Sequence, residues 1–163
     1  MENRKRESFV NLVYDNINII YKVCRLYSSI DDEDLQQEII YQLWKAYPSF
    51  EGKSKFQTWM YRVALNTAIV GFRKRKIKTI PLSREVGDRF ISDPSEDISE
   101  QIELLYEHIN QLDDVEKAVI FLYLEKCSYE EISQVLGLSP GNIGVKLNRI
   151  KKKLRAMFEV SKI

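Results

Sequence analysis

The segment at residues 128–155, "SYEEISQVLGLSPGNIGVKLNRIKKKLR", constrains the fold most strongly, because it carries start and stop signals for two consecutive helices. Ser128 and Glu131 have the S-x-x-E spacing of a capping box, in which each side chain binds the free backbone N–H of the other residue. Gly137 stands where the first helix must end, at a position that favours a left-handed backbone. The Ser-Pro dipeptide after it can cap and begin the next helix. The segment therefore predicts a helix-turn-helix.

The second helix of this motif has an apolar face and, next to it, a cationic face. The apolar positions are spaced 4, 3 and 4 residues apart: Ile143, Leu147, Ile150 and Leu154. The same spacing one residue earlier gives a second face, about 100° away around the helix: Asn142, Lys146, Arg149 and Lys153. Such a face can enter a major groove, with its first residues at base edges and its later cations at phosphates.

Two other interpretations of this basic helix are weaker. A helical hairpin could carry its charges only as a solvated surface, but the caps, the glycine turn and the basic face occur together here. A membrane-surface helix needs an apolar face without a partner, whereas the preceding helix supplies a partner. We therefore predict that the motif binds DNA. A helix-turn-helix alone does not separate a repressor, an activator and an initiation factor.

The rest of the chain also has helical rather than strand periodicity. Apolar positions recur at helical spacing over residues 7–28, over 33–47 up to Pro48, and over 55–76. The pattern fails in "TIPLSREVGDRFISDPSED" and resumes at Ile98, with a stripe that begins at Ile102 and with Asp113 or Asp114 as the cap of a further helix. Gly and Pro number only 6 and 4 of 163 residues. We predict an all-α fold of two small domains, 1–78 and 99–163, joined by a linker at 79–98.

Composition argues against several classes of protein. Two distant cysteines and a single histidine are too few for a zinc site or a disulfide framework, and there is no Gly-rich phosphate loop or nucleophile motif. We therefore expect no cofactor, no metal and no enzymatic activity. The N-terminus lacks an apolar signal region, and no apolar run approaches membrane-spanning length. The sequence thus predicts a cytoplasmic protein without membrane insertion.

The first half of the chain resembles a known family. The segment "DDEDLQQEIIYQLWKAYPSFEGKSKFQTWMYRVALNTAIVGFRKRK" contains D-x-x-Q-E, an apolar helix with a Trp, a Phe-Gly loop, T-W-x-x-R-x-A-x-N and a basic end. It resembles the second conserved domain of bacterial RNA polymerase sigma factors of the small extracytoplasmic-function type. The helix-turn-helix resembles the fourth domain of the same family. The two blocks stand in the family's order and cover nearly the whole chain.

The resemblance implies a docking site for core RNA polymerase on the second helix. In this family the Asp-Gln-Glu helix docks on a coiled coil of the largest polymerase subunit. The matching polar positions here are Asp34, Gln37, Glu38 and Tyr41. An acidic, amide-rich face suits a basic partner helix. An ordinary solvated face is the alternative for each of these residues.

The resemblance also implies that the third helix recognises and melts the minus-ten promoter element, with an unstacked base held near the loop before it. Aromatic and cationic side chains favour such binding. The matching candidates are Lys53, Lys55, Trp59, Arg62, Asn66, Arg73 and Arg75. Among them, Arg62, Arg73 and Arg75 are expected at phosphates. We interpret Trp59 and Phe56 as core residues that shape the loop, whose neighbouring aromatic residues include Phe50 and Tyr61.

The helix-turn-helix would then bind the minus-thirty-five element. The matching candidates are Ser139, Asn142, Val145, Lys146, Arg149 and Lys153. Asn142 replaces the family's usual Thr, Gly144 a common Lys, and Val145 a Ser. In the first half, Val70 stands where many relatives have Asp. We therefore do not expect the family's usual promoter sequence to apply unchanged.

The resemblance thus implies three partners: core RNA polymerase, promoter DNA and an anti-sigma factor. Two rival functions remain open at this point. A stand-alone helix-turn-helix regulator would bind its operator without polymerase, and a helical adaptor would tolerate charge reversal between Lys146 and Lys153.

Overall fold

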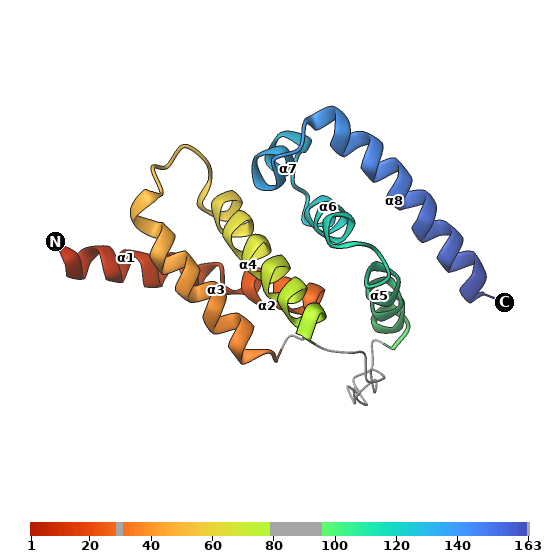
Figure 1. Ribbon diagram of the computed structural model, residues 1–163, viewed down its shortest axis with the longest axis horizontal. Coiled ribbons are helices and arrows are strands. Elements are labelled where there is room, and N and C mark those ends of the chain that lie inside the picture. The colour runs from red at the N-terminus through yellow and green to blue at the C-terminus, as the bar shows by residue number, and fades with distance from the viewer. Residues whose placement is uncertain (29–30, 79–95, 163) are drawn as a thin grey trace.

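The computed structural model describes residues 1–28, 31–78 and 96–162, and only the backbone at 75–78 and 96–98. The described residues form eight α-helices and one 3-10 helix, without strands (Figure 1). Their bounds are α1 Glu2–Asp15, α2 Ile17–Tyr27, α3 Glu33–Ala46, η1 Tyr47–Ser49, α4 Phe56–Lys78, α5 Glu96–Ile109, α6 Asp114–Leu124, α7 Tyr129–Leu136 and α8 Pro140–Ser161. The predicted all-α class is confirmed. Residues 79–95, most of the expected linker, lie outside the described residues.

The first predicted helix, over 7–28, is in fact two helices. The break lies at Asn16, whose backbone has φ −118° and ψ 18°. The Asn16 side-chain amide donates a hydrogen bond of 2.8 Å to the Leu12 carbonyl. Local bonds of this kind offer the backbone an alternative to helical hydrogen bonding. The prediction of one continuous helix is therefore wrong, although the apolar spacing on both sides of the break was correct.

Helices α2, α3 and α4 pack together around an apolar core. The Asp32 carboxylate caps α3 by accepting a 3.0 Å hydrogen bond from the Leu35 N–H. The predicted apolar stripe of α3 is buried at Leu35, Ile39 and Leu43. These residues meet α4, whose inward positions include fully buried Met60 and Leu65. The opposite side of α3 remains exposed.

The second half contains the predicted helix-turn-helix as α7 and α8. Both capping-box hydrogen bonds form between Ser128 and Glu131. Gly137 has φ +71°, so it reverses the chain in the left-handed region. Ser139 caps α8, because its hydroxyl accepts a hydrogen bond from the Asn142 N–H at 3.3 Å. The four predicted apolar residues of α8 are all buried against α6 and α7.

The stripe predicted at the start of the second half is only partly buried. Asp113 caps α6, and Ile109 and Leu112 belong to the core. Ile102, in contrast, is 43% exposed, because the facing end of α8 leaves a groove beside it. The prediction of a buried stripe is therefore right for Ile109 and Leu112 and wrong for Ile102.

The two halves of the chain pack against each other through α4, α6 and α7 (Figure 1). The Tyr61 ring lies 5.9 Å from the Phe121 ring, centroid to centroid. The Tyr27 hydroxyl donates a 2.6 Å hydrogen bond to the Asp114 carbonyl. Buried Lys117 lies over the rings of Tyr27 and Phe72, at 5.7 and 5.1 Å. Tyr61 therefore packs between the halves rather than among the loop aromatics.

Candidate nucleic-acid and protein interfaces

An aromatic cluster supports the loop that joins η1 to α4. The ring of half-buried Trp59 lies 5.1 Å from Phe50, 5.4 Å from Phe56 and 6.3 Å from Tyr47. Gly52, with φ +71°, provides the turn at the tip of the loop. Trp59 thus lies under the loop as a support, and the loop presents Lys53 and Lys55 to solvent.

The other candidate residues of α4 lie on its outward side. Arg62 and Asn66 are exposed, one helical turn apart, and Arg73 follows two turns later. The Arg73 side chain is 60% exposed. The Arg75 side chain lies outside the described residues. The structure therefore brings Arg62, Asn66 and Arg73 onto one exposed stripe that continues from the loop.

Three of the cations in the loop and in α4 form ion pairs. Lys53 pairs with Glu51 in the loop itself, at 2.6 Å. Lys55 pairs with Glu131 of α7 at 3.4 Å, and Arg73 pairs with Asp114 of α6 at 3.1 Å. A hydrogen bond from the Ser128 backbone, aided by Lys55, lowers the pKa of Glu131 below its usual value. Sequence periodicity gave no sign of the last two pairs, because 76 and 41 residues separate their members.

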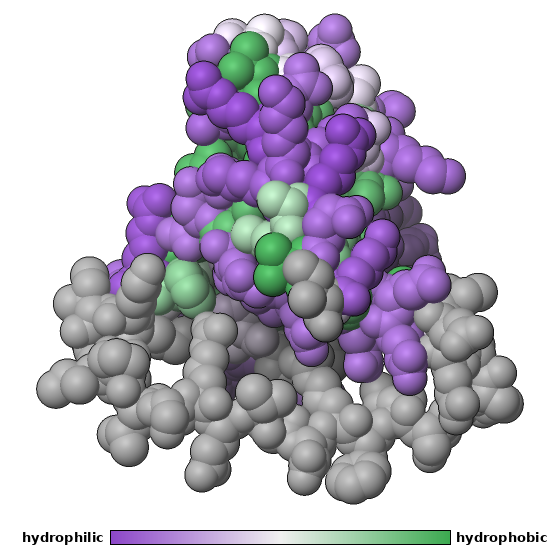
Figure 2. Space-filling model, turned by 90° about the vertical axis from the view of Figure 1, so that its right-hand side faces the viewer, coloured by the Kyte–Doolittle hydropathy of each residue, from purple (hydrophilic) through white to green (hydrophobic). Residues whose placement is uncertain are grey.

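The predicted DNA-binding face of α8 points away from the core. Asn142, Val145 and Arg149 are exposed, and Lys146 is half-buried. Figure 2 views the molecule from the side of α8 and shows mostly hydrophilic side chains on that side of the molecule. The polar and cationic character of the face makes it suitable for a nucleic acid rather than for an apolar partner.

Two candidates on α8 have structural partners of their own. The Ser139 hydroxyl is engaged in the helix cap, so its contact with DNA would come from its remaining hydrogen-bonding capacity. Lys153 forms an ion pair with Glu116 of α6 within the same half. The structure therefore places the most accessible part of the face at Asn142, Val145 and Arg149.

The polymerase-docking candidates Asp34, Gln37, Glu38 and Tyr41 are all exposed on one side of α3. Their spacing of 3, 1 and 3 residues places them on adjacent turns of one face. Two of them, Gln37 and Tyr41, also line a groove of about 520 Å³ between α1 and α3. The candidate surface is therefore continuous with an apolar groove.

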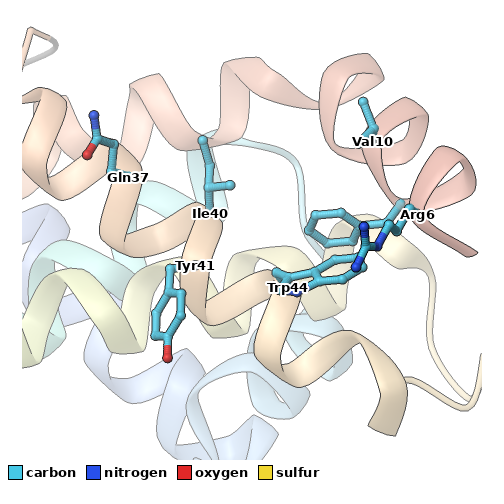
Figure 3. Close-up of a pocket in the computed structure, with 7 residues that line it drawn as sticks. Arg6, Val10, Gln37, Ile40, Tyr41 and Trp44 are labelled. Carbon is cyan, nitrogen blue, oxygen red and sulfur yellow. The ribbon is translucent and has the colours of Figure 1, made fainter. Parts of the chain in front are cut away.

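Residues beyond the predicted set complete this groove. Figure 3 shows Gln37 toward one end of it and Arg6 beside Trp44 at the other. The Arg6 guanidinium carbon lies 6.0 Å from the Trp44 ring centroid, and Ile40 and Val10 are exposed there. The sequence prediction omitted Trp44, although it follows Tyr41 by three residues on the same helix. That spacing was the signal that could have identified it.

The described residues hold no group of three or more His, Cys, Asp or Glu side chains suited to a metal ion. Among the same residues, no helix combines the length and apolar character needed to cross a bilayer.

Two family models match successive parts of the chain. The model for sigma-70 region 2 matches residues 12–77, and the model for sigma-70 region 4 matches residues 102–154. The first match contains α3 and all but the last residue of α4, and the second contains α7 and most of α8. Together the two matches cover most of the chain, in the order that the sequence motifs indicated.

Individual relatives agree with these matches. The ECF RNA polymerase sigma factor SigW of Bacillus subtilis is 28% identical, over 92% of this chain and 88% of its own length. SigG of Mycobacterium tuberculosis, an ECF sigma factor, is 39% identical over 45% of this chain, but this match spans only 19% of SigG. The sigma factor RpoE of Bartonella quintana, solved with the anti-sigma factor NepR, has a TM-score of 0.67 and 21% identity. That comparison covers 98% of this chain and 99% of RpoE, and it shows the shared fold.

Proposed function

Because the chain belongs to the extracytoplasmic-function (ECF) group of the sigma-70 family, we propose that it binds core RNA polymerase and directs initiation at specific promoters. The observation that carries this proposal is the joint presence of regions 2 and 4, in order, on one chain. A stand-alone regulator needs only the helix-turn-helix and leaves the whole region 2 match without a role.

The α3 face is the proposed docking surface for core polymerase. Asp34, Gln37, Glu38 and Tyr41 supply acidic, amide and aromatic contacts on one exposed side. An acidic surface of this kind complements a basic helix and speeds its association. Docking through α3 leaves the outward stripe of α4 free to meet DNA.

The loop before α4 and the α4 stripe are the proposed minus-ten site. Trp59 supports the loop, Arg62 and Asn66 contact the separated strand, and Arg73 neutralises phosphates. Melting follows because holding an unstacked base favours the open strand over the duplex.

The exposed face of α8 is the proposed minus-thirty-five site. Asn142, Val145 and Lys146 contact base edges near the helix start, and Arg149 and Lys153 contact phosphates. We place the domain boundaries at 1–78 and 99–163, so that the linker sets the distance between the two DNA contacts.

Three further features belong to the same proposal. The protein acts in the cytoplasm, and it catalyses no bond formation, which is the task of the polymerase. An anti-sigma factor regulates it. The support for this is that RpoE of Bartonella quintana, which has the same fold, was solved in complex with the anti-sigma factor NepR. No cofactor is required.

Transcription from a pool of genomic fragments tests the proposal. Core RNA polymerase is incubated with the pool, with and without the protein, and the transcripts are mapped. The proposal predicts transcripts that start at defined promoters only when the protein is present. Transcription without change in start sites, together with no binding to core polymerase, would overturn it.

A further inference from the structure

We propose that Tyr129 and Val145, on either side of Gly144, form a contact site for the C5-methyl group of a thymine in the minus-thirty-five element. These three residues are called the methyl site below. The inference rests on the proposed function, since that function places the start of α8 in the major groove. It goes beyond that function by naming the base, and the group on that base, that this part of the motif recognises.

Gly144 allows the first helix of the motif to contribute to the exposed face of the second. Gly144 lies in the second turn of α8, and a Cβ built on it would lie 3.5 Å from Tyr129 Cε2. The Tyr129 ring therefore lies beside the place where any side chain at position 144 would begin. Gly144 is only partly exposed although it has no side chain, which is consistent with a ring that covers it. An aromatic ring from α7 thus lies where α8 itself offers no side chain.

The backbone that carries this ring is held in place by local hydrogen bonds. Tyr129 is the first residue of α7 and follows the N-cap residue Ser128. The Ser128 N–H donates a 2.8 Å hydrogen bond to the Glu131 carboxylate, and the Glu131 N–H donates one of 3.1 Å to the Ser128 hydroxyl. The buried residues Ile132 and Ile143 belong to the core that α7 and α8 share. Because the support is already ordered, binding a base there costs little additional entropy.

The methyl site exposes carbon atoms within a polar face. Tyr129 is 40% exposed and Val145 is 51% exposed. Val145 directly follows Gly144, so its side chain projects about 100° further around α8 than the covered position. The exposed neighbours Asn142 and Arg149 can reach hydrogen-bond acceptors or phosphates, whereas the valine and the ring offer mainly apolar contact. This part of the face is therefore suited to an apolar group on a base edge.

Thymine is the base that supplies such a group. In the major groove, only thymine presents a methyl group, and apolar side chains contact it there. Cytosine at the same place would present an amino group, for which the carbon atoms of Val145 and of the Tyr129 ring provide no acceptor. A polar group that loses water without gaining a partner weakens binding. The methyl site therefore favours thymine through the contact that it makes and disfavours cytosine through the contact that it lacks.

Replacing single thymines by deoxyuridine tests the methyl contact directly, because this change removes the methyl group and keeps the base pair. Core polymerase with the wild-type protein is bound to a promoter found in the transcription assay. Each thymine of the minus-thirty-five element, on either strand, is replaced in turn. We expect about a fourfold loss of affinity at one position, as for the withdrawal of one buried apolar carbon, and little change at the others.

Variants of the methyl site identify the side chains that make the contact. The measured quantity is the ratio of affinities for the thymine and deoxyuridine promoters, which is insensitive to a general loss of binding. We expect the ratio at the sensitive position to fall from about four to below about two in Tyr129→Ala and in Val145→Ala. Tyr129→Phe keeps the ring and should keep the wild-type ratio.

Two matched controls make the same substitutions at other exposed positions. Val160→Ala changes a 71% exposed valine near the end of α8, and Tyr14→Ala changes a 76% exposed tyrosine of α1. Both controls should keep the wild-type ratio. If Tyr129→Ala does not fold, Val145→Ala decides the outcome, because it places a stronger helix former at an exposed helical position.

The outcomes separate this inference from the proposed function. A ratio near one at every thymine, or a minus-thirty-five element without thymine, would overturn the methyl site while promoter-specific transcription still supports the proposed function. A wild-type ratio that persists in Val145→Ala and in folded Tyr129→Ala would also overturn it, since the methyl group would then be contacted elsewhere. Absence of promoter-specific transcription would overturn the proposed function and this inference with it.

Discussion

Gly137 and Gly144 both lie in the helix-turn-helix, but only Gly137 has a backbone conformation that favours glycine. Gly137 has φ +71°, where a side chain is strained, whereas a Cβ at Gly144 would lie 3.5 Å from Tyr129 Cε2, an ordinary contact. We expect Gly137→Ala to lower the free energy of unfolding by about 1–2 kcal/mol. Gly144→Ala should raise it by roughly 0.5–1 kcal/mol, because alanine loses less entropy in a helix. Urea denaturation of both variants measures the difference, and equal effects would contradict the assigned geometry.

Tyr27 and Tyr61 make stability sensitive to alkaline pH. Burial, reinforced by nearby Asp114 for Tyr27 and by Glu125 for Tyr61, raises the pKa of each phenol above its ordinary value of 10.0. The folded state therefore keeps protons that the unfolded state releases, so these groups stabilise the fold fully below pH 10 and less as pH rises above it. Unfolding free energies of wild type and Tyr27→Phe/Tyr61→Phe, measured between pH 8 and 11, should converge as pH rises. A constant difference across this range would refute the linkage.

At the residue scale, features that depend on neighbouring residues could be predicted from the sequence, and features that depend on distant residues could not. Ser128, Glu131 and Gly137 could be assigned because capping and chain reversal depend on a few neighbouring residues. The position of Tyr61 could not, because its partner Glu125 lies 64 residues away. The bend at Asn16 depends on one side-chain hydrogen bond that competes with an otherwise regular helix.

At the scale of single elements, α8 separates base contacts from phosphate contacts. Arg149→Ala should weaken promoter binding by the holoenzyme to a similar extent on different upstream sequences and reduce its salt slope by about 1. Asn142→Ala should instead change which base is preferred at one upstream position. Binding titrations at several salt concentrations, on promoters that differ at single bases, distinguish the two effects. An equal change of base preference in both variants would contradict this division.

The exposed face of α3 carries a separate prediction. Glu38→Lys should reduce binding to core polymerase at least tenfold, because it reverses a charge on the proposed docking face. Binding of the same variant to a minus-ten oligonucleotide should not fall. Glu7→Lys, an exposed position on α1, provides the matched charge reversal. A pull-down measures binding to core polymerase, and a titration measures binding to the oligonucleotide. Equal loss of polymerase binding in Glu38→Lys and Glu7→Lys would argue against α3 as the docking surface.

Element types and faces were largely predictable, because apolar periodicity reflects burial directly. The stripes of α3 and α8 are buried as expected. The groove between α1 and α3 was missed, because it depends on how two helices meet and not on either helix alone. The exposure of Ile102 has the same origin, since the facing end of α8 leaves its neighbourhood open.

At the scale of the whole molecule, the two halves together identify the family more specifically than either half alone. The helix-turn-helix alone was compatible with several classes of DNA-binding protein, and the region 2 match determines the family. The packing of α4 on α6 and α7 could not be predicted from sequence, because neither half carries a local sign of the other. Yet this packing brings Asp114 and Glu131 to the cations of α4.

Strand separation at a promoter tests the central claim most directly. Core polymerase with the wild-type protein is bound to a promoter found in the transcription assay, and unpaired thymines are detected by permanganate. The account predicts reactive thymines from the minus-ten element to the start site, only with the protein present and with strong loss in Arg62→Ala/Asn66→Ala. A duplex that stays closed with wild-type holoenzyme on every transcribed promoter, or opens equally without the protein, would contradict the account.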